Sequence, residues 1–126
     1  FVRGDRAVVN STTARLDDWR HAIATEARDA MASTPLMEGP LTVSLWFTFA
    51  RPASHYLPAN SRRPVRVLRL DAPEYVTTAP DIDKLERAAL DAMAGVVYAN
   101  DRAVVRLHGD KRYDEWSGVE VRVVRL

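Results

Sequence analysis

The spacing of apolar side chains changes along the chain and predicts different elements in different segments. Between residues 11 and 32, apolar side chains recur every three or four positions, which is typical of an amphipathic helix. These positions are Leu16, Trp19, Ile23, Ala27 and Ala30 or Met31. The Ser-Thr-Thr triplet at 11–13 supplies N-cap candidates for this helix. Residues 41–50 instead alternate between apolar and polar, which predicts a half-buried strand.

The second half of the chain predicts one more helix and two more strands. A helical stripe covers residues 84–93 and Gly95 is placed to end it. We expect strands at 103–108 and 119–124, joined as an antiparallel hairpin, and a loop over residues 1–10. The fold class predicted from this order is α+β: a two-layer sandwich in which two main helices cover one face of a mixed or antiparallel sheet. Residues 1–126 are expected to form a single domain.

The long connection between the first strand and the second helix, residues 51–80, has an unusual composition. It holds five of the seven prolines, and residues 51–70 contain five arginines and no acidic residue. Short strands are expected at 65–70 and 75–78, with the remainder irregular. We predict phosphate contacts from this segment, since guanidinium groups bind phosphate in bidentate fashion; the alternative is a solvated loop. The arginines concerned are Arg62, Arg63, Arg66 and Arg69. Lys111 and Arg112, in the predicted hairpin, form a smaller patch with the same two interpretations.

Overall composition narrows the function only slightly. The net charge of +1 gives no global attraction to nucleic acid, and the absence of cysteine excludes disulfides and thiolate metal sites. The apolar runs are much shorter than the roughly 20 residues that span a bilayer, so no membrane partner is expected. A cytoplasmic location is the expectation.

Two aspartates at the start of the second predicted helix are the strongest candidates for chemistry. Asp81 and Asp83 are one residue apart, and carboxylates at this spacing in extended chain project to the same side, where a hard cation such as Mg²⁺ takes such oxygens as ligands. The alternative is a capping box of Asp83 with Glu86. Asp101 supplies a third carboxylate if its turn lies beside the start of the helix; the alternative is an ordinary polar turn.

Basic residues beside these acids fit phosphodiester chemistry. Arg87 and Lys84 would neutralise charge in the transition state. The alternative for Arg87 is an ion pair with Asp83 or Asp91 along the helix. The histidines show no metal-ligand spacing, and no glycine-rich phosphate loop is present. The pattern therefore favours a metal-dependent nuclease.

One stretch resembles a known family. Residues 80–87, Pro-Asp-Ile-Asp-Lys-Leu-Glu-Arg, followed by Leu-Asp-Ala-Met at 90–93, Gly-Val-Val at 95–97 and Asn-Asp-Arg-Ala-Val at 100–104, are similar to the RusA family of Holliday junction resolvases. The resemblance covers residues from about 41 to the C-terminus. It implies a homodimeric, Mg²⁺-dependent endodeoxyribonuclease, for which Mn²⁺ would be expected to substitute. Its substrate would be the four-way DNA junction, cut by paired nicks in recombination and repair, in a bacterial or phage-infected cell.

The resemblance assigns Asp81, Asp83 and Asp101 as catalytic, metal-binding aspartates, with DNA contacts from Lys84 and the basic segments. Four positions depart from the family pattern. Arg87 replaces a lysine and keeps the charge without being able to deprotonate, Lys84 replaces an asparagine, Asn100 an acid and Ala103 a glutamine. These departures leave two alternatives open: a catalytically impaired module that binds junctions or branched DNA, and an enzyme that acts on other branched or flapped DNA.

Overall fold

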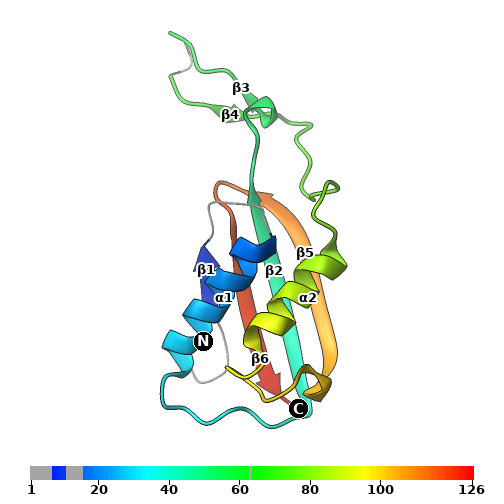
Figure 1. The fold of residues 1–126 in the computed structure, drawn as a ribbon. Coiled ribbons are helices and arrows are strands. Elements are labelled where there is room, and N and C mark those ends of the chain that lie inside the picture. Colours follow the sequence, from blue (N-terminus) through cyan, green and yellow to red (C-terminus); the bar gives the residue numbers. More distant parts are fainter. Residues whose placement is uncertain (1–6, 11–15, 63) are drawn as a thin grey trace.

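The computed structural model describes residues 7–10, 16–62 and 64–126. Its main sheet has four strands: β1 (Ala7–Asn10), β2 (Leu41–Ala50), β5 (Val104–Asp114) and β6 (Gly118–Arg125), in the order β1-β6-β2-β5 (Figure 1). β2 pairs parallel with β5 and antiparallel with β6, and β1 pairs antiparallel with β6. The sheet is therefore mixed, and the predicted α+β class is confirmed.

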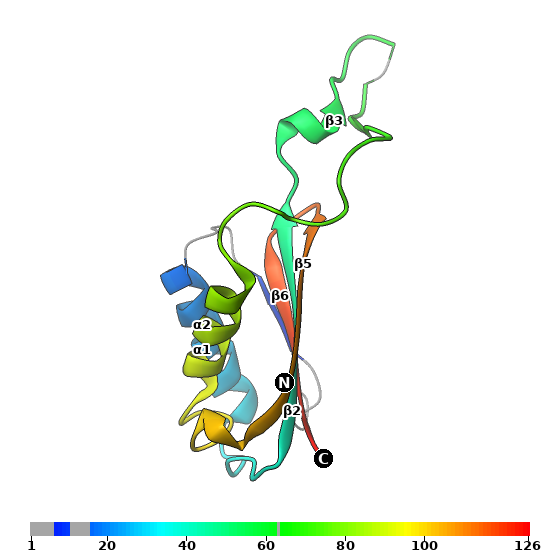
Figure 2. The same cartoon turned by 90° about the vertical axis from the view of Figure 1, so that its right-hand side faces the viewer.

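Two helices, α1 (Leu16–Met31) and α2 (Ile82–Met93), lie together on one face of this sheet and leave the other face uncovered (Figure 2). The buried residues of α1 are Trp19, Ile23, Ala27 and Met31, as the helical spacing predicts. Its predicted N-cap at 11–13 lies outside the described residues. α2 begins two residues earlier than expected, and Gly95 follows its end with a φ of 79°. No helix in the described segments is long and apolar enough to cross a bilayer.

β2 is the centre of the hydrophobic core. Its alternating residues Leu41, Val43, Leu45, Phe47 and Phe49 are all buried against the helices. Trp19 of α1 packs edge-on against Phe47, with ring centroids 5.7 Å apart. Burying such side chains contributes about 1.5–3 kcal/mol each. The strict alternation predicted the bounds of this strand correctly because one face is buried and the other is not.

Three predictions about the strands are wrong. β5 and β6 are not a hairpin, because β2 lies between them. The parallel pairing of β2 with β5 needs a crossover connection, which α2 supplies, and β6 then returns along the other side of β2. Residues 109–114 were expected to be a turn but continue β5, which is polar there because it is an edge strand. Residues 1–10 were expected to be a loop, yet β1 forms there on β6.

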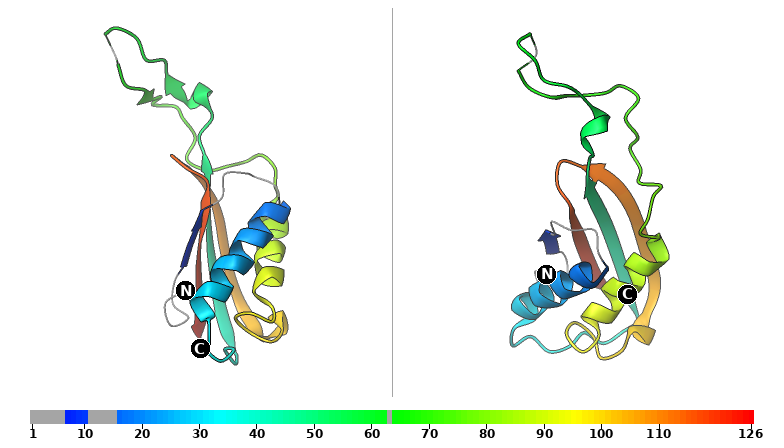
Figure 3. Two further views of the ribbon diagram at one scale, coloured as in Figure 1. Left: turned by 60° about the vertical axis from the view of Figure 1, so that its left-hand side comes forward. Right: turned by 45° about the horizontal axis from the view of Figure 1, so that its top comes forward.

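Residues 51–74, which we call the arm, extend beyond the end of the sheet (Figures 1 and 3). The arm contains a short 3₁₀ helix, η1 (Ala53–His55), and two strands, β3 (Tyr56–Leu57) and β4 (Val67–Leu68), which pair antiparallel. β4 lies within the predicted segment 65–70, whereas β3 was not predicted. The expected strand at 75–78 is reduced to one bridge between Tyr75 and Arg112. A second 3₁₀ helix, η2 (Asp101–Ala103), precedes β5.

Candidate functional site

At the start of α2, neither of the two aspartate carboxylates makes a capping hydrogen bond. Asp81 is the N-cap residue, with extended backbone (φ −66°, ψ 146°), but its carboxylate makes no capping hydrogen bond. Asp83 lies within the first turn. The alternative of a capping box of Asp83 with Glu86 is therefore wrong, because the helix starts one residue before Asp83. Both carboxylates are exposed and remain available for a ligand.

Asp81 has one close charged neighbour. The Lys84 Nζ lies 3.5 Å from the Asp81 Oδ2, and both side chains are more than 60% exposed. An ion pair this exposed contributes about 0–1 kcal/mol, so a divalent cation or a phosphate could displace it at little cost. A cavity of about 450 Å³ opens beside Asp81; its lining includes Val76, Thr78, Gly109, Asp110 and Lys111. The carboxylate thus stands at the edge of a concave surface between α2 and β5.

Residues 75–80, which we call the strap, lead from the arm to Asp81 and are fastened to β5. The Val76 N–H donates to the Lys111 carbonyl at 3.2 Å. The Lys111 Nζ donates to the Thr78 carbonyl at 2.7 Å. Lys111, predicted to contact DNA, is thus also a residue that holds the approach to Asp81.

Arg112 also contacts residues of the same protein, at the base of the arm. Its guanidinium donates to Asp110 at 3.2 Å and to Glu74 at 2.9 Å, and it lies over the Tyr75 ring at 5.0 Å. The other oxygen of Asp110, Oδ1, is buried without a hydrogen-bond partner. The small basic patch predicted at 111–112 is therefore part of the scaffold between β5 and the strap.

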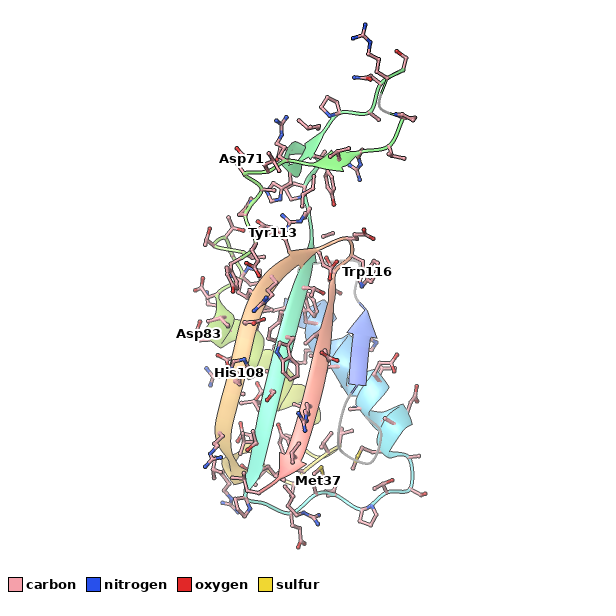
Figure 4. All side chains as sticks on the ribbon, turned by 180° about the vertical axis from the view of Figure 1, so that it is seen from behind. Met37, Asp71, Asp83, His108, Tyr113 and Trp116 are labelled. Atoms are coloured by element: carbon pink, nitrogen blue, oxygen red, sulfur yellow. The ribbon has the colours of Figure 1, made fainter. Side chains whose placement is uncertain are left out.

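Glu86 is a further acidic residue of this region that sequence reasoning treated only as a helix cap. It projects from α2 across Gly109 of β5, where an added Cβ would lie 3.0 Å from the Glu86 Oε2. Burial raises the pKa of Glu86, the nearby Asp83 raises it further, and His108 opposes the shift. Figure 4 shows Asp83 and His108 on these two neighbouring elements. Only the packing of α2 on β5 reveals this arrangement.

The raised pKa of Glu86 gives a prediction for stability. A carboxyl whose pKa is higher in the folded state binds its proton more tightly there, so ionisation destabilises the fold as the pH rises through that pKa. We expect Glu86→Gln to raise the Tm at pH 8 and to change it little at pH 4, as measured by thermal unfolding. Glu26→Gln on the exposed face of α1 is the matched control. A Tm increase of equal size at both pH values would contradict the assignment.

Arg87 is exposed on the face of α2 and has no salt bridge with Asp83 or Asp91 among the contacts that the structure describes. The helical ion pair that we considered as an alternative is therefore absent. Its guanidinium is one turn from Asp83 and is free to meet an anion that approaches the start of α2.

Asp101 lies at the opposite end of α2 from the other two aspartates. Buried Tyr98 donates from its hydroxyl to the Leu90 carbonyl at 2.8 Å, and the pKa of Tyr98 is raised by burial and by the nearby carboxylates of Asp101 and Asp91. Tyr98 also forms an isolated β-bridge with Met37. Figure 4 places Met37 at the lower end of the sheet, away from Asp83. Since twelve helical residues span about 18 Å, one chain does not bring the three aspartates together. Within the described segments, no three acidic or histidine side chains gather as a metal site.

The predicted DNA-contacting arginines have different surroundings in the arm. Arg69 donates from Nε to the Ser54 carbonyl at 3.0 Å, and Arg66 lies over the Tyr56 ring at 4.5 Å. Arg62 is exposed. Arg63 lies outside the described residues. These arginines are on the arm, whereas the aspartates are on the body of the domain.

Exposed carboxylates at the start of a helix, next to a cavity and a basic arm, define a domain suited to act on nucleic-acid phosphates. The sequence model of endodeoxyribonuclease RusA matches residues 3–124, nearly the whole chain. The chain therefore belongs to the RusA endodeoxyribonuclease family, which consists of Holliday junction resolvases and whose substrate is branched DNA. No curated protein matches it. The resemblance of residues 80–104 to this family is confirmed.

Proposed function

We propose that this chain is an Mg²⁺-dependent resolvase that cuts four-way DNA junctions by paired, symmetric nicks, in the cytoplasm of a bacterial or phage-infected cell. The observation that carries the proposal is the start of α2, where Asp81 and Asp83 are both exposed and neither carboxylate makes a capping hydrogen bond. Their oxygens are the hard ligands that Mg²⁺ and Mn²⁺ prefer. When bound, the cation polarises the phosphoryl group and lowers the pKa of an attacking water.

The neighbouring residues would orient the DNA strand and balance charge. Arg87, without an ion pair on its own helix, would neutralise the negative charge that builds up on the scissile phosphate. Because arginine stays protonated, it would not act as a base. Lys84, now beside Asp81, would exchange that carboxylate for a phosphate oxygen as the strand binds. Lys111 would keep the strap, and with it Asp81, in place.

The position of Asp101 favours a homodimer in which the two chains share their sites. A two-fold symmetric pair with antiparallel α2 helices would place Asp101 of one copy near Asp81 and Asp83 of the other. Each metal site would then contain carboxylates from both subunits, and a monomer would be inactive. Two such sites related by the two-fold axis suit the two like strands of a junction.

The first half of the β5 edge, before the strap and the arm meet β5 at residues 111–113, offers the surface for this pairing. β5 is the last strand of the sheet, and Val105 and Leu107 on it are exposed by 58% and 43%. Antiparallel pairing of two β5 strands would extend the sheet across the two-fold axis and bury these side chains. It would also bring the start of one β5, next to Asp101, towards residues 109–111 of the other, which line the cavity beside Asp81.

The proposal is tested with a labelled synthetic four-way junction and a linear duplex of equal length. We expect symmetric nicks in the junction only, with Mg²⁺ or Mn²⁺ and not with EDTA. Equal cutting of the duplex would contradict junction selectivity, and cutting in EDTA would contradict metal dependence.

A second candidate is a module that binds junctions but cuts them poorly. It is favoured by Lys84, which departs from the family pattern and already pairs with Asp81, and by Asn100, whose side chain accepts the Arg102 N–H at 3.0 Å instead of supplying a carboxylate. Tight junction binding in EDTA, without cleavage when Mg²⁺ is added, would select this candidate.

A further inference from the structure

The arm projects from the domain, and contacts at its base hold it in place. At its base, the Arg51 guanidinium donates to the Pro73 carbonyl at 2.7 Å and lies 5.4 Å from the centroid of the Tyr113 ring. His55 packs edge-on against Tyr113, with ring centroids 4.7 Å apart. The Tyr113 N–H donates to the Glu74 carbonyl at 3.0 Å. The two limbs of the arm are thereby joined to each other and to β5.

The outer part of the arm exposes apolar side chains that the domain does not use. Leu70 is fully exposed and Val65 is 69% exposed, while Val67 and Leu68 are each 43% exposed. Small proteins seldom leave several large apolar side chains together in water unless they meet a partner. Phosphate binding does not account for them, because phosphate offers nothing for an aliphatic side chain to contact.

The same part of the arm carries cationic and aromatic groups. Arg66 stacks over Tyr56 at 4.5 Å, and residues 51–70 contain five arginines and no acidic residue. This charge indicates a polyanion as the occupant. A second copy of this chain fits less well, because it has a net charge of +1 and brings an arm of the same sign. Apolar and aromatic groups can contact exposed base faces, and guanidinium groups can contact phosphates. Together they suit DNA in which both the base faces and the phosphates are exposed.

We propose that the arm enters the branch point of the DNA and packs Leu70, Val65 and their apolar neighbours against bases that are unstacked there. This inference rests on the proposed function. Continuous duplex hides its base faces, so contact with them distinguishes a branch from a linear helix. The returning limb of the arm continues through the strap to Asp81, eleven residues after Leu70. Seating the arm at the branch therefore sets which phosphate can reach the start of α2.

The test uses the full chain with a four-way junction that carries 2-aminopurine next to the branch point, in Ca²⁺ so that binding is observed without cleavage. The wild-type protein is expected to increase the 2-aminopurine fluorescence, because that base loses its stacking. The double variant Val65→Ser/Leu70→Ser is expected to lose most of this increase and to bind the junction about tenfold more weakly, while its affinity for linear duplex changes less than about twofold. Both side chains are exposed, so the fold should be retained; circular dichroism checks this.

Two controls separate the base contacts from charge and from surface change. Arg62→Gln is expected to weaken junction and duplex by the same factor, because a phosphate contact carries no preference for the branch. Leu126→Ser, at an exposed leucine outside the arm, is expected to change neither affinity. Unchanged fluorescence and affinity in the double variant would overturn the inference, as would an equal loss on duplex. A change in the oligomeric mass of the double variant would overturn it in favour of a second copy as the occupant.

The inference and the proposed function fail in different ways. If the wild-type protein cuts junctions in Mg²⁺ but gives no fluorescence change in Ca²⁺, the role of the arm is overturned and the nuclease assignment stands. If it unstacks the branch-point base through Leu70 and Val65 yet never cuts, the arm assignment is supported and the nuclease assignment is lost.

Discussion

Replacing Asp83 with asparagine is expected to lower the rate of junction cleavage about 1,000-fold, equivalent to ~4 kcal/mol of transition-state stabilisation. Asparagine keeps the shape of the side chain but removes the charge that would hold the cation at the start of α2. The substitution should cost the helix only about 0.3–1 kcal/mol, through its lost interaction with the helix dipole. Cleavage is measured under single-turnover conditions, with junction affinity in Ca²⁺ measured in parallel.

Asp29→Asn is the matched control, since Asp29 is an exposed aspartate on α1. It is expected to cleave at the wild-type rate. The Asp83 variant should still bind junctions, because the DNA contacts that we propose come from the arm and from Arg87. A cleavage rate within tenfold of the wild-type rate would contradict the assignment of Asp83 as a metal ligand. Loss of cleavage together with a loss of helicity would point to a structural role instead.

Mixing two inactive variants is expected to restore nicking if the sites are shared between subunits. Asp81→Asn and Asp101→Asn should each be inactive as homodimers, because both of their sites lack one carboxylate. In a mixed dimer, one site combines the intact Asp101 of the first variant with the intact Asp81 of the second, while the other site lacks both. With random exchange, about a quarter of the wild-type number of sites should return.

The products distinguish the two arrangements. A mixed dimer with one working site should give single nicks and few paired cuts, as resolved on a denaturing gel. If Asp101 served the Asp81 of its own chain, each mixed dimer would still lack a complete site, and no nicking would return. Mixing Asp81→Asn with Asp83→Asn is the control that should not restore activity under either arrangement, since these two residues lie at the same end of α2.

Sequence reasoning was most accurate where a segment is governed by burial on one side. β2 was predicted from Leu41 to Ala50, and the buried stripe of α1 was predicted from its spacing. The predictions of strands failed where burial does not impose an alternation of apolar and polar residues. β5 is an edge strand with mostly polar, partly exposed residues, so its second half looked like a turn, and the order of β6, β2 and β5 depends on contacts between distant segments.

The site shows the same division. The two aspartates at the start of α2, the basic segment at 51–70 and the family were all apparent from residue type and spacing, because these are local properties of the chain. Only the tertiary structure showed that Asp83 is no cap, that Lys111 and Arg112 hold the strap and the arm, and that Asp101 lies at the far end of α2. A side chain's partners are set by which elements pack together, and packing joins residues that the sequence keeps apart.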